Sequence, residues 1–552
     1  MSALSAGVVE REYVLTPNSE LRVQLPCDRT NASLTISLQQ NTTVESADPK
    51  HNTNSCEING SELVPGVPYT FEGGSGIGLF SNTGCTLRVR GPARVVREVY
   101  TTTSTNTRLS IRDLHLQLNQ KRGQARDAEK DGSENLGPRV LVVGTESVGK
   151  TAVAHTLVNY AARTGYRPLF LDLDSIRVNE CATLSCVDAP FDPTDGPQFI
   201  PHLSYFFGDR DIAANWALLK HCLATVMTDV EQRCGRYRRT RLGGLVIDCP
   251  PLPIGDDSAQ GPTSTGAQAD SSLEFIHHII VECGIDYVVT VGSDRLRNQI
   301  RRHCQVKVFE AKGGSLAVGG NSAASGISSW LPQDMQDMMD EDAPAKKVPE
   351  KAQFLKDLAN SEVTTATTVS GHLIRLVSID PLGGSVRWFP EERVYRWYNS
   401  WFRYFFGPPS AGLTPTPIDI QWQEHKFVQL SAVETSALAG LLPLDSDDAQ
   451  TSQAHVTSFS DIDITAAKFT NKILAVSPVS LLSPSGERLG ELAVEEALKK
   501  GIVVGFVWVI AVQEHTKTMK LLSPSPSLPT KGGTCFYVCR ESTLQKSLLM
   551  KR

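Results

Sequence analysis

The chain has 552 residues, of which 40% are hydrophobic and 21% are charged, and its formal net charge is −6. This composition is typical of a soluble globular protein with several domains, and the weak acidic balance excludes a general electrostatic affinity for nucleic acid. No apolar run approaches the ~20 residues that span a bilayer, and the N-terminus lacks a signal-peptide pattern, so we expect no membrane contact.

The twelve cysteines are scattered along the chain, and without a secretory signal we expect them to be reduced thiols of the core. Cys535 and Cys539 have a spacing that could also suit a metal ion. Alternation along a strand places both on one face, but no second pair of ligands lies near them. Core packing is the favoured interpretation, and zinc is the alternative.

Residues 1–105 contain short runs of alternating apolar and polar residues, including 94–96, separated by clusters of Gly, Asn and Asp. Such spacing predicts a small N-terminal β-sandwich domain. Residues 106–138 follow as a helix and linker. The helical spacing covers 109–120, and 121–138 is charged and poor in apolar residues, so we expect a linker there.

A strand-like run at 139–143 leads directly into Gly144-x-x-x-x-Gly149-Lys150-Thr151, the P-loop (Walker A) pattern. The glycines let successive amide groups curl around phosphates, Lys150 reaches the β- and γ-phosphates, and the Thr151 hydroxyl completes a Mg²⁺ shell. A helix predicted at 152–164 aims its positive end at the same anion. This context disfavours a chance glycine-rich turn and predicts a nucleoside triphosphate site. The candidate contacts are Gly144, Thr145, Ser147, Val148, Gly149, Lys150, Thr151 and Ala152.

Residues 139–407 alternate strands and helices, which predicts an α/β domain with a parallel sheet and helices on both faces. We expect strands at 168–174, 242–248, 287–291 and 372–377, and helices at 215–232 and 273–283. Residues 304–371 shift to Gly, Ser, Ala, Met and acidic residues, which predicts a mobile insertion. Residues 408–552 contain strand-like runs again, so we expect a C-terminal β-rich α+β domain.

Two basic segments allow two interpretations each. Aromatic residues alternate with arginine over 394–407, a pattern that could stack on bases but more often docks a helix on a core, which we favour. The run Arg236-Tyr237-Arg238-Arg239-Thr240-Arg241 could be a nuclear import signal or a surface loop, and we favour the loop.

The order of the domains and a set of short segments resemble one family closely. The segments include Ser19-Glu20-Leu21-Arg22, Gly60-Ser61-Glu62-Leu63, Asn159-Tyr160-Ala161, Arg403-Tyr404-Phe405-Phe406-Gly407 and Val504-Gly505-Phe506. The chain resembles the Clp-one family, the polynucleotide kinases of the pre-mRNA cleavage and polyadenylation machinery. The resemblance implies a nuclear protein that binds ATP and Mg²⁺ between the β-domain and the P-loop. It also implies a single copy within a hetero-complex, whose partner is the cleavage-factor scaffold protein of 3′-end processing, and possible contact with RNA.

The resemblance also implies how the base side of ATP is held. The family's glutamate falls at Glu20, for which a solvated surface carboxylate is the alternative interpretation. The family's second contact is a lysine that falls near Gly76, where this sequence has no lysine, so a backbone contact would have to replace it.

Kinase chemistry needs a carboxylate for the hydroxyl proton and cations for the transferring phosphoryl group. Asp174 is expected to end the second strand as the base, and Asp248 to end the third and hold Mg²⁺ through water; both could instead be strand-end caps. By resemblance, Arg295, Arg301 and Arg302 occupy the position of a lid helix that closes over phosphates. A solvated basic helix face is the alternative.

Two features depart from the active family. Its Thr-x-Gly-Trp clasp is replaced by Asp248-Cys249-Pro250-Pro251, and residues 175–181 replace its glutamines and Pro-Gly. Losing a stacking contact costs about 1–3 kcal/mol of binding. The sequence therefore favours an ATP-binding scaffold required for pre-mRNA cleavage, with an active RNA 5′-hydroxyl kinase as the alternative function.

Overall fold

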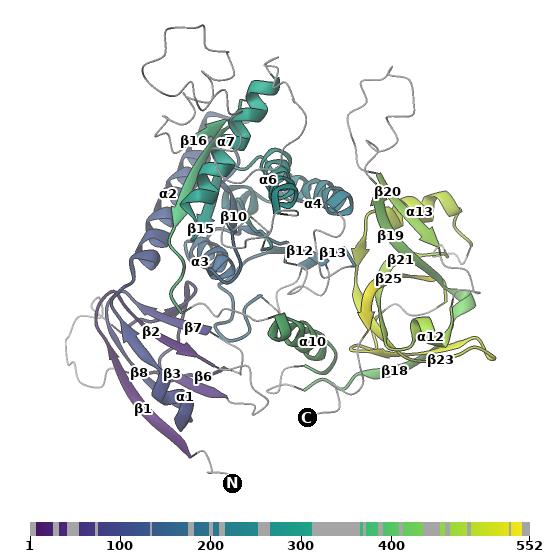
Figure 1. The fold of residues 1–552 in the computed structure, drawn as a ribbon, viewed down its shortest axis with the longest axis horizontal. Helices are drawn as coiled ribbons and strands as arrows, with labels where there is room; N and C mark the ends of the chain where they lie inside the picture. Colours follow the sequence, from purple (N-terminus) through teal and green to yellow (C-terminus); the bar gives the residue numbers. More distant parts are fainter. Residues whose placement is uncertain are drawn as a thin grey trace.

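In the computed structural model, the chain forms an N-terminal β-sandwich, a central α/β domain and a C-terminal β-rich domain (Figure 1). The predicted fold class is confirmed. The structure describes residues 7–25, 33–40, 54–71, 76–132, 135–174, 181–197, 202–208, 216–251, 265–311, 365–367, 371–384, 390–407, 412–433, 453–458, 464–482, 487–528 and 532–543.

The β-sandwich consists of two sheets with the strand orders β1-β8-β3-β6 and β5-β4-β7-β2-β9. Inward side chains such as Leu21, Ile36 and Leu87 are fully buried and form a core of their own. The strands are β1 (Val8–Leu15), β2 (Ser19–Gln24), β3 (Leu34–Leu38), β4 (Glu57–Ile58), β5 (Ser61–Glu62), β6 (Pro68–Phe71), β7 (Gly76–Ser81), β8 (Cys85–Pro92) and β9 (Tyr100–Thr102).

Two local expectations in this region are wrong. The run at 94–96 belongs to a short helix, α1 (Ala93–Glu98), which buries Val95 and Val96 against the sandwich. The helix α2 (Asn106–Ala128) extends well past residue 120, into the segment expected to be a linker. Its charged second half is held by tertiary contacts, because Arg122 is fully buried and donates to the carbonyl oxygen of Gly243 at 3.2 Å.

The central sheet has the order β16-β17-β15-β10-β14-β11-β12-β13-β22 in the described part of the chain. Its inner strands β17, β15, β10, β14 and β11 are parallel, as predicted, and helices cover both faces. The strands are β10 (Arg139–Gly144), β11 (Leu169–Asp172), β14 (Leu245–Asp248), β15 (Tyr287–Val291) and β17 (Leu373–Ile379). The helices are α3 (Lys150–Arg163), α4 (Trp216–Arg236), α5 (Arg238–Gly243), α6 (Thr265–Glu282) and α7 (Asp294–Ala311).

The sheet is mixed rather than purely parallel. Four strands that the sequence did not predict as part of this sheet pair antiparallel with their neighbours: β12 (Cys181–Cys186), β13 (His202–Phe206), β16 (Thr365–Thr367) and β22 (Ile502–Val503). The last comes from the C-terminal part of the chain, so the sheet is completed by a segment far away in sequence.

The C-terminal domain is built on a sheet with the order β18-β24-β23-β21-β25-β19-β20. Cys535 and Cys539 are fully buried in this sheet and belong to a core that continues into the central domain. The elements are β18 (Thr416–Gln421), β19 (Lys426–Val433), β20 (Gln453–Ser458), α12 (Ala466–Phe469), β21 (Lys472–Ser480), α13 (Glu491–Lys499), β23 (Gly505–Gln513), β24 (Thr518–Ser523) and β25 (Thr534–Thr543).

The aromatic segment forms α10 (Pro390–Phe406), which lies beside the C-terminal domain in Figure 1. Trp401 is fully buried and meets the ring of Phe506 edge-on at 4.9 Å between centroids. The Tyr404 hydroxyl accepts the backbone N–H of Phe506 at 2.8 Å. The prediction that this helix docks its aromatic face on a core is confirmed.

The expected insertion at 304–371 lies mostly outside the described residues. Its first part does not match the expectation of a mobile segment, because 304–311 is the last part of α7 and Cys304 is buried. Near its end, β16 pairs with β17. No helix of the described ranges combines the length and the apolar character needed to cross a membrane.

We expect Trp401→Ala to destabilise the protein by about 3–5 kcal/mol, because it removes a fully buried ring where the central and C-terminal cores meet. The measurement is urea denaturation followed by circular dichroism. Val394→Ala on the exposed part of the same helix is the control and should change stability by less than about 0.5 kcal/mol. Equal effects of the two substitutions would contradict the docking role.

Candidate nucleotide site

The loop between β10 and α3 has the curled backbone of an anion-binding site. Ser147 and Gly149 both adopt left-handed conformations, with φ of 58° and 94°. Left-handed residues in such a loop turn successive N–H groups toward one side, which creates a concave nest for an anion. β10 lies between β14 and β15, so the loop leaves the carboxyl edge of the sheet where ligands of α/β domains bind.

Both motif glycines are required by crowding. A Cβ atom on Gly144 would lie 2.7 Å from the Val291 carbonyl oxygen, and one on Gly149 would lie 2.6 Å from the Cβ of Leu382. Only Gly149 also has a positive φ. From the motif, both glycines were expected to be needed for the curl of the chain. Gly144 is instead required because the neighbouring strand leaves no room for a side chain.

The start of α3 suits a phosphate group. Lys150 is buried, and its Nζ donates to the carbonyl oxygen of Thr145 at 2.7 Å, so its charge lies within the loop. Among the described residues, no side chain caps the N-terminus of α3 and its first turn has no acidic residue. The helix dipole and its first N–H groups therefore favour an anion at this end, and the half-buried Thr151 and Ala152 follow directly.

Two buried carboxylates end neighbouring strands beside this loop. Asp248 ends β14 and is in register with Asp172, the last residue of β11. Both are nearly inaccessible, with 1% and 2% of their surface exposed. Asp172 is not among the predicted site residues, although the alternation in Leu171-Asp172-Leu173-Asp174 places both aspartates on one face.

Asp174 lies two residues beyond the end of β11, which corrects the expectation that it ends the strand. Its backbone N–H donates to Asp172 Oδ1 at 3.0 Å, and its side chain is half-buried. Burial raises the pKa of the Cys249 thiol, on which the charges of Lys150, Asp248 and Asp174 also act. The predicted lysine, metal ligand and base follow or end three neighbouring parallel strands, β10, β14 and β11, at the same edge of the sheet.

This donor set fits Mg²⁺. A threonine hydroxyl at the loop and a carboxylate at the next strand end are hard oxygen donors of the kind that Mg²⁺ prefers. Thr151 and Asp248 would hold the ion, and Asp172 places a second carboxylate beside Asp248. The structure shows no geometry for the ion itself.

The three arginines predicted to belong to a lid are spread along α7. Gly292, just before the helix, lies against the P-loop, because a Cβ there would be 3.1 Å from Val148 Cγ1. Arg295 is exposed in the first turn, close to that contact. Arg301 and Arg302 lie about 9 Å or more farther along the axis, at 1.5 Å per residue. Arg301 is buried, and its pKa is lowered by burial and then by Arg302 and Arg297. Only Arg295 is therefore placed at the loop end of the helix.

Glu20 is a buried ion-pair centre rather than a solvated carboxylate, so the alternative interpretation is wrong. It is 1% exposed and accepts from Arg108 Nη2 at 2.8 Å and from Arg22 Nε at 2.9 Å. Gly76 is exposed and pairs with Gln24, four residues along β2 from Glu20, a distance of about 13 Å at 3.3 Å per residue. Glu20 and Gly76, the two residues predicted to contact the base of ATP, are thus well apart. The segment 72–75 lies outside the described residues.

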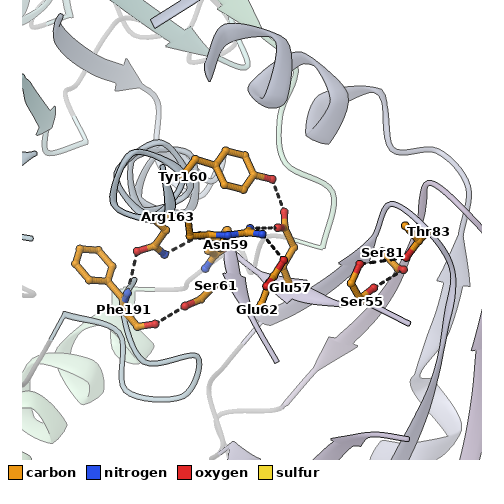
Figure 2. A network of polar contacts seen from close by, with 12 residues as sticks. Ser55, Glu57, Asn59, Ser61, Glu62, Ser81, Thr83, Tyr160, Arg163 and Phe191 are labelled. Carbon is orange, nitrogen blue, oxygen red and sulfur yellow. Dashed lines mark hydrogen bonds and ion pairs between the residues drawn. The ribbon is translucent and has the colours of Figure 1, made fainter. Parts of the chain in front are cut away.

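A polar joint that the sequence did not predict connects the β-sandwich to α3 (Figure 2). The hairpin β4–β5 places Glu57 against the helix, where the carboxylate accepts from Arg163 Nη1 at 2.8 Å and from the Tyr160 hydroxyl. Asn159 Nδ2 donates to the Asn59 carbonyl oxygen at 2.8 Å, and its Oδ1 accepts the Phe191 N–H at 2.9 Å.

The tight turn of this hairpin fits closely against the helix. Asn59 and Gly60 have φ of 47° and 82°, as hairpin turns require, and a Cβ on Gly60 would lie 3.1 Å from the Thr156 carbonyl oxygen. Asn-Gly is a turn signal in the sequence, but only the tertiary structure shows that the turn contacts the helix of the P-loop. The sandwich is therefore docked on α3 by direct contacts between the two domains.

The basic run at 236–241 makes contacts within the fold, as expected for the interpretation that it is not an import signal. Most of it lies in the helix α5 and not in the expected loop. Arg238 and Arg241 both pair with Glu129 beyond the end of α2, at 2.7 and 2.6 Å. Arg239 donates to the Gly165 carbonyl oxygen at 2.9 Å. Arg238 and Arg241 therefore connect the end of α2 to α5, and Arg239 connects α5 to the turn after α3.

Three family descriptions match the chain in the order of its domains. They are "N-terminal beta-sandwich domain of polyadenylation factor" over residues 14–125, "mRNA cleavage and polyadenylation factor CLP1 P-loop" over 144–255 and "Pre-mRNA cleavage complex II protein Clp1" over 413–532. Together they cover more than half of the chain. The chain belongs to the Clp1 family. The predicted resemblance is confirmed, and the P-loop region is the nucleotide-binding domain type of that family.

Relatives of the family carry two different names. "Polyribonucleotide 5'-hydroxyl-kinase Clp1" of Danio rerio is 25% identical over 474 residues, which cover 85% of this chain and 84% of that protein. "mRNA cleavage and polyadenylation factor CLP1" of Phaeosphaeria nodorum is 24% identical over 540 residues, covering 95% and 91%. The Homo sapiens kinase is 30% identical over 254 residues, 45% of this chain and 54% of that one.

Two solved structures share the fold. Both contain Clp1p with Pcf11p; the first has a TM-score of 0.62 and 17% identity, and covers 97% of this chain and 99% of that one. The second has a TM-score of 0.60, 17% identity and coverage of 98% and 99%. The first structure is described as giving the structural basis for ATP loss in a glycine-to-arginine point mutant of that protein. At this identity the likeness establishes the fold.

The joint contains a buried histidine that makes stability depend on pH. His115 of α2 meets the Tyr160 ring edge-on at 5.1 Å. Burial, followed by the charges of Arg122 and Arg163, lowers the pKa of His115 to about 4. The unfolded chain binds this proton near pH 6.5, so the folded state loses stability as the pH falls from 6.5 toward 4.

We expect the free energy of unfolding to fall by about 2 kcal/mol between pH 7 and pH 5 through His115 alone. Urea denaturation of the wild type and of His115→Gln at both pH values measures the difference. The variant should lose less stability on acidification, because Gln takes up no proton. Parallel losses in the two proteins would show that His115 titrates normally.

Proposed function

We propose that this protein is an ATP-binding scaffold subunit of the pre-mRNA 3′-end cleavage and polyadenylation machinery, required for endonucleolytic cleavage. ATP is held constitutively between the β-sandwich and the P-loop domain. The observation that carries the proposal is the P-loop nest, with buried Lys150 at its centre and an uncapped α3 behind it. The names of the fungal relative and of the Clp1p–Pcf11p complexes support the setting.

The setting implies further properties. A relative named as a cleavage and polyadenylation factor supports residence in the nucleus, and two structures with Pcf11p support a scaffold protein of the same complex as the partner. A single copy would then act within a hetero-complex. The domain limits 1–105, 106–138, 139–407 and 408–552 remain our proposal for this architecture.

The chain's own residues would bind the triphosphate as follows. The N–H groups of Ser147 and Gly149 surround the phosphates, Lys150 offsets their negative charge, and the N-terminus of α3 adds its dipole. Thr151, and Asp248 through water, would hold Mg²⁺, which would offset part of the negative charge of the triphosphate. Bound ATP adds to the direct joint at Glu57, Asn59 and Arg163 rather than replacing it. A ligand of the folded state adds ~4 kcal/mol at a thousand times its dissociation constant.

An active RNA 5′-hydroxyl kinase is the second candidate function. Asp174 lies just beyond the carboxyl end of β11, at the sheet edge where a base for the hydroxyl would act, and Arg295 lies in the first turn of α7. The Danio rerio relative carries a kinase name. The chain nevertheless has Cys249-Pro250-Pro251 where the active family has its RNA clasp, which favours the scaffold.

We expect Lys150→Ala to weaken ATP binding at least about tenfold, since it removes the cation buried in the nest. Isothermal titration with ATP and Mg²⁺ measures affinity, and thermal melting with and without ATP measures stabilisation. The control is Lys130→Ala, an exposed lysine paired only with Asp127 among the contacts described. ATP that raises the melting temperature of the wild type and the control, but not of Lys150→Ala, supports the proposal. A wild-type melting temperature that ATP leaves unchanged contradicts it.

We expect purified protein to retain intact nucleotide and to label a 5′-hydroxyl RNA only weakly with γ-labelled ATP and Mg²⁺. The reason is the missing clasp, which costs the RNA about ten- to a hundredfold in binding. Asp174→Asn and Lys150→Ala serve as the negative variants. Strong labelling that disappears in both variants would establish the kinase and overturn the scaffold as the main function.

A further inference from the structure

A short segment after β17 covers the outer side of the P-loop. We call residues 381–384, Pro-Leu-Gly-Gly, the strap. The N–H of Leu382 donates to the Val148 carbonyl oxygen at 3.0 Å. The Leu382 side chain fills the space beside Gly149 and is 7% exposed. The strap is therefore in direct contact with the part of the loop that would bind phosphate.

The opposite side of the strap contacts the β-sandwich. A Cβ on Gly383 would lie 2.1 Å from Nη2 of Arg22, and one on Gly384 would lie 3.2 Å from Cδ of the same side chain. The Arg22 side chain thus lies flat against the two glycines. Thr107, at the start of α2, donates its hydroxyl to the Pro381 carbonyl oxygen at 3.5 Å.

Arg22 is held in place by an ion pair with Glu20. Its Nε donates to Glu20 Oε2 at 2.9 Å, while Glu20 Oε1 accepts two bonds from Arg108 of α2, at 2.8 and 3.1 Å. Glu20 is 1% exposed, and the Arg22 side chain is 16% exposed. A Cβ on Gly78 would lie 2.2 Å from Glu20 Oε1, so the neighbouring strand leaves room for this pairing only through a glycine.

The contact with Val148 matters because of peptide geometry. The carbonyl group of Val148 and the N–H group of Gly149 belong to one planar peptide and point in opposite directions. When the strap binds the carbonyl oxygen on the outside, the N–H of Gly149 must point to the inside of the nest, toward a phosphate. Loss of the strap would let this peptide rotate and remove one donor from the nest.

We propose that Arg22 is a positioning residue for the nucleotide: through the strap, the β-sandwich sets the phosphate affinity of a loop in another domain. The proposal rests on the proposed nucleotide binding and adds a regulatory route to it. Any partner that shifts the β-sandwich would change ATP affinity along the same contacts, without touching the nucleotide.

The test is ATP affinity of the full chain, measured by isothermal titration. We expect Arg22→Ala to raise the Kd for ATP about tenfold, the value of one hydrogen bond to a charged group. The Kd of this variant for inorganic tripolyphosphate should rise by the same factor, because the substitution changes the P-loop that binds the phosphates. If Arg22→Ala loses affinity for ATP but not for tripolyphosphate, Arg22 contacts the base of ATP directly, and the positioning role is overturned.

A second variant changes the strap side of the contact between Arg22 and Gly383. Gly383 has no positive φ, so Gly383→Ala leaves the backbone unstrained but pushes the Arg22 guanidinium away. We expect the two substitutions to be non-additive, with the double variant no weaker than either single one. Gly235→Ala is the matched control, because a Cβ there meets no atom within 4 Å.

The outcomes separate the two proposals. A wild type that binds neither ATP nor tripolyphosphate overturns the proposed function together with this inference. A wild type that binds ATP, with Arg22→Ala and Gly383→Ala binding equally well, overturns the inference alone. Additive losses of ATP affinity would show that Arg22 and the strap act independently and would overturn the route through the strap. Lower melting temperatures with an unchanged Kd would show that Arg22 only stabilises the fold. If Arg22→Ala does not fold, Gly383→Ala decides the question.

Discussion

The orientation of one peptide group, between Val148 and Gly149, is the constraint on which the site depends. Its carbonyl oxygen is bound by the Leu382 N–H, and Gly149 holds a φ of 94° against the Leu382 side chain. At the other end of the loop, Gly144 is pressed against Val291. The loop is therefore held by contacts with neighbouring segments, which would reduce the reorganisation that binding an anion requires.

The β-sandwich reaches the central domain at two separate places. The hairpin turn at Asn59 and Gly60 docks on the second half of α3, and Arg22 docks on the strap at the other end of the site. Both contacts are direct contacts between side chains and backbone of the two domains. ATP between them would then strengthen and report on an existing interface, because a ligand bound to both sides stabilises their relative position.

Sequence reasoning succeeded where the signal is local. The P-loop, the strands β10, β14 and β15, and the role of α10 all depend on short patterns of glycine or apolar spacing. Prediction from the sequence failed where contacts between distant segments determine the local structure. The charged end of α2 is helical because α5 binds it, the strand β22 arrives from the C-terminal part, and Glu20 is buried by two arginines. The alternation around Asp172 marks its face of the strand, but only the parallel register shows that it lies beside Asp248.

The sequence by itself determined that a P-loop turn sits at 144–151 in an α/β domain, and that two β-rich regions flank it. Backbone geometry near a glycine and side-chain periodicity are encoded within a few residues, so they can be read directly. The tertiary structure alone decided which surfaces meet the turn, since the strap and Arg22 are more than 300 residues apart in the chain. Contacts over such separations depend on how whole domains pack, and no local pattern specifies them.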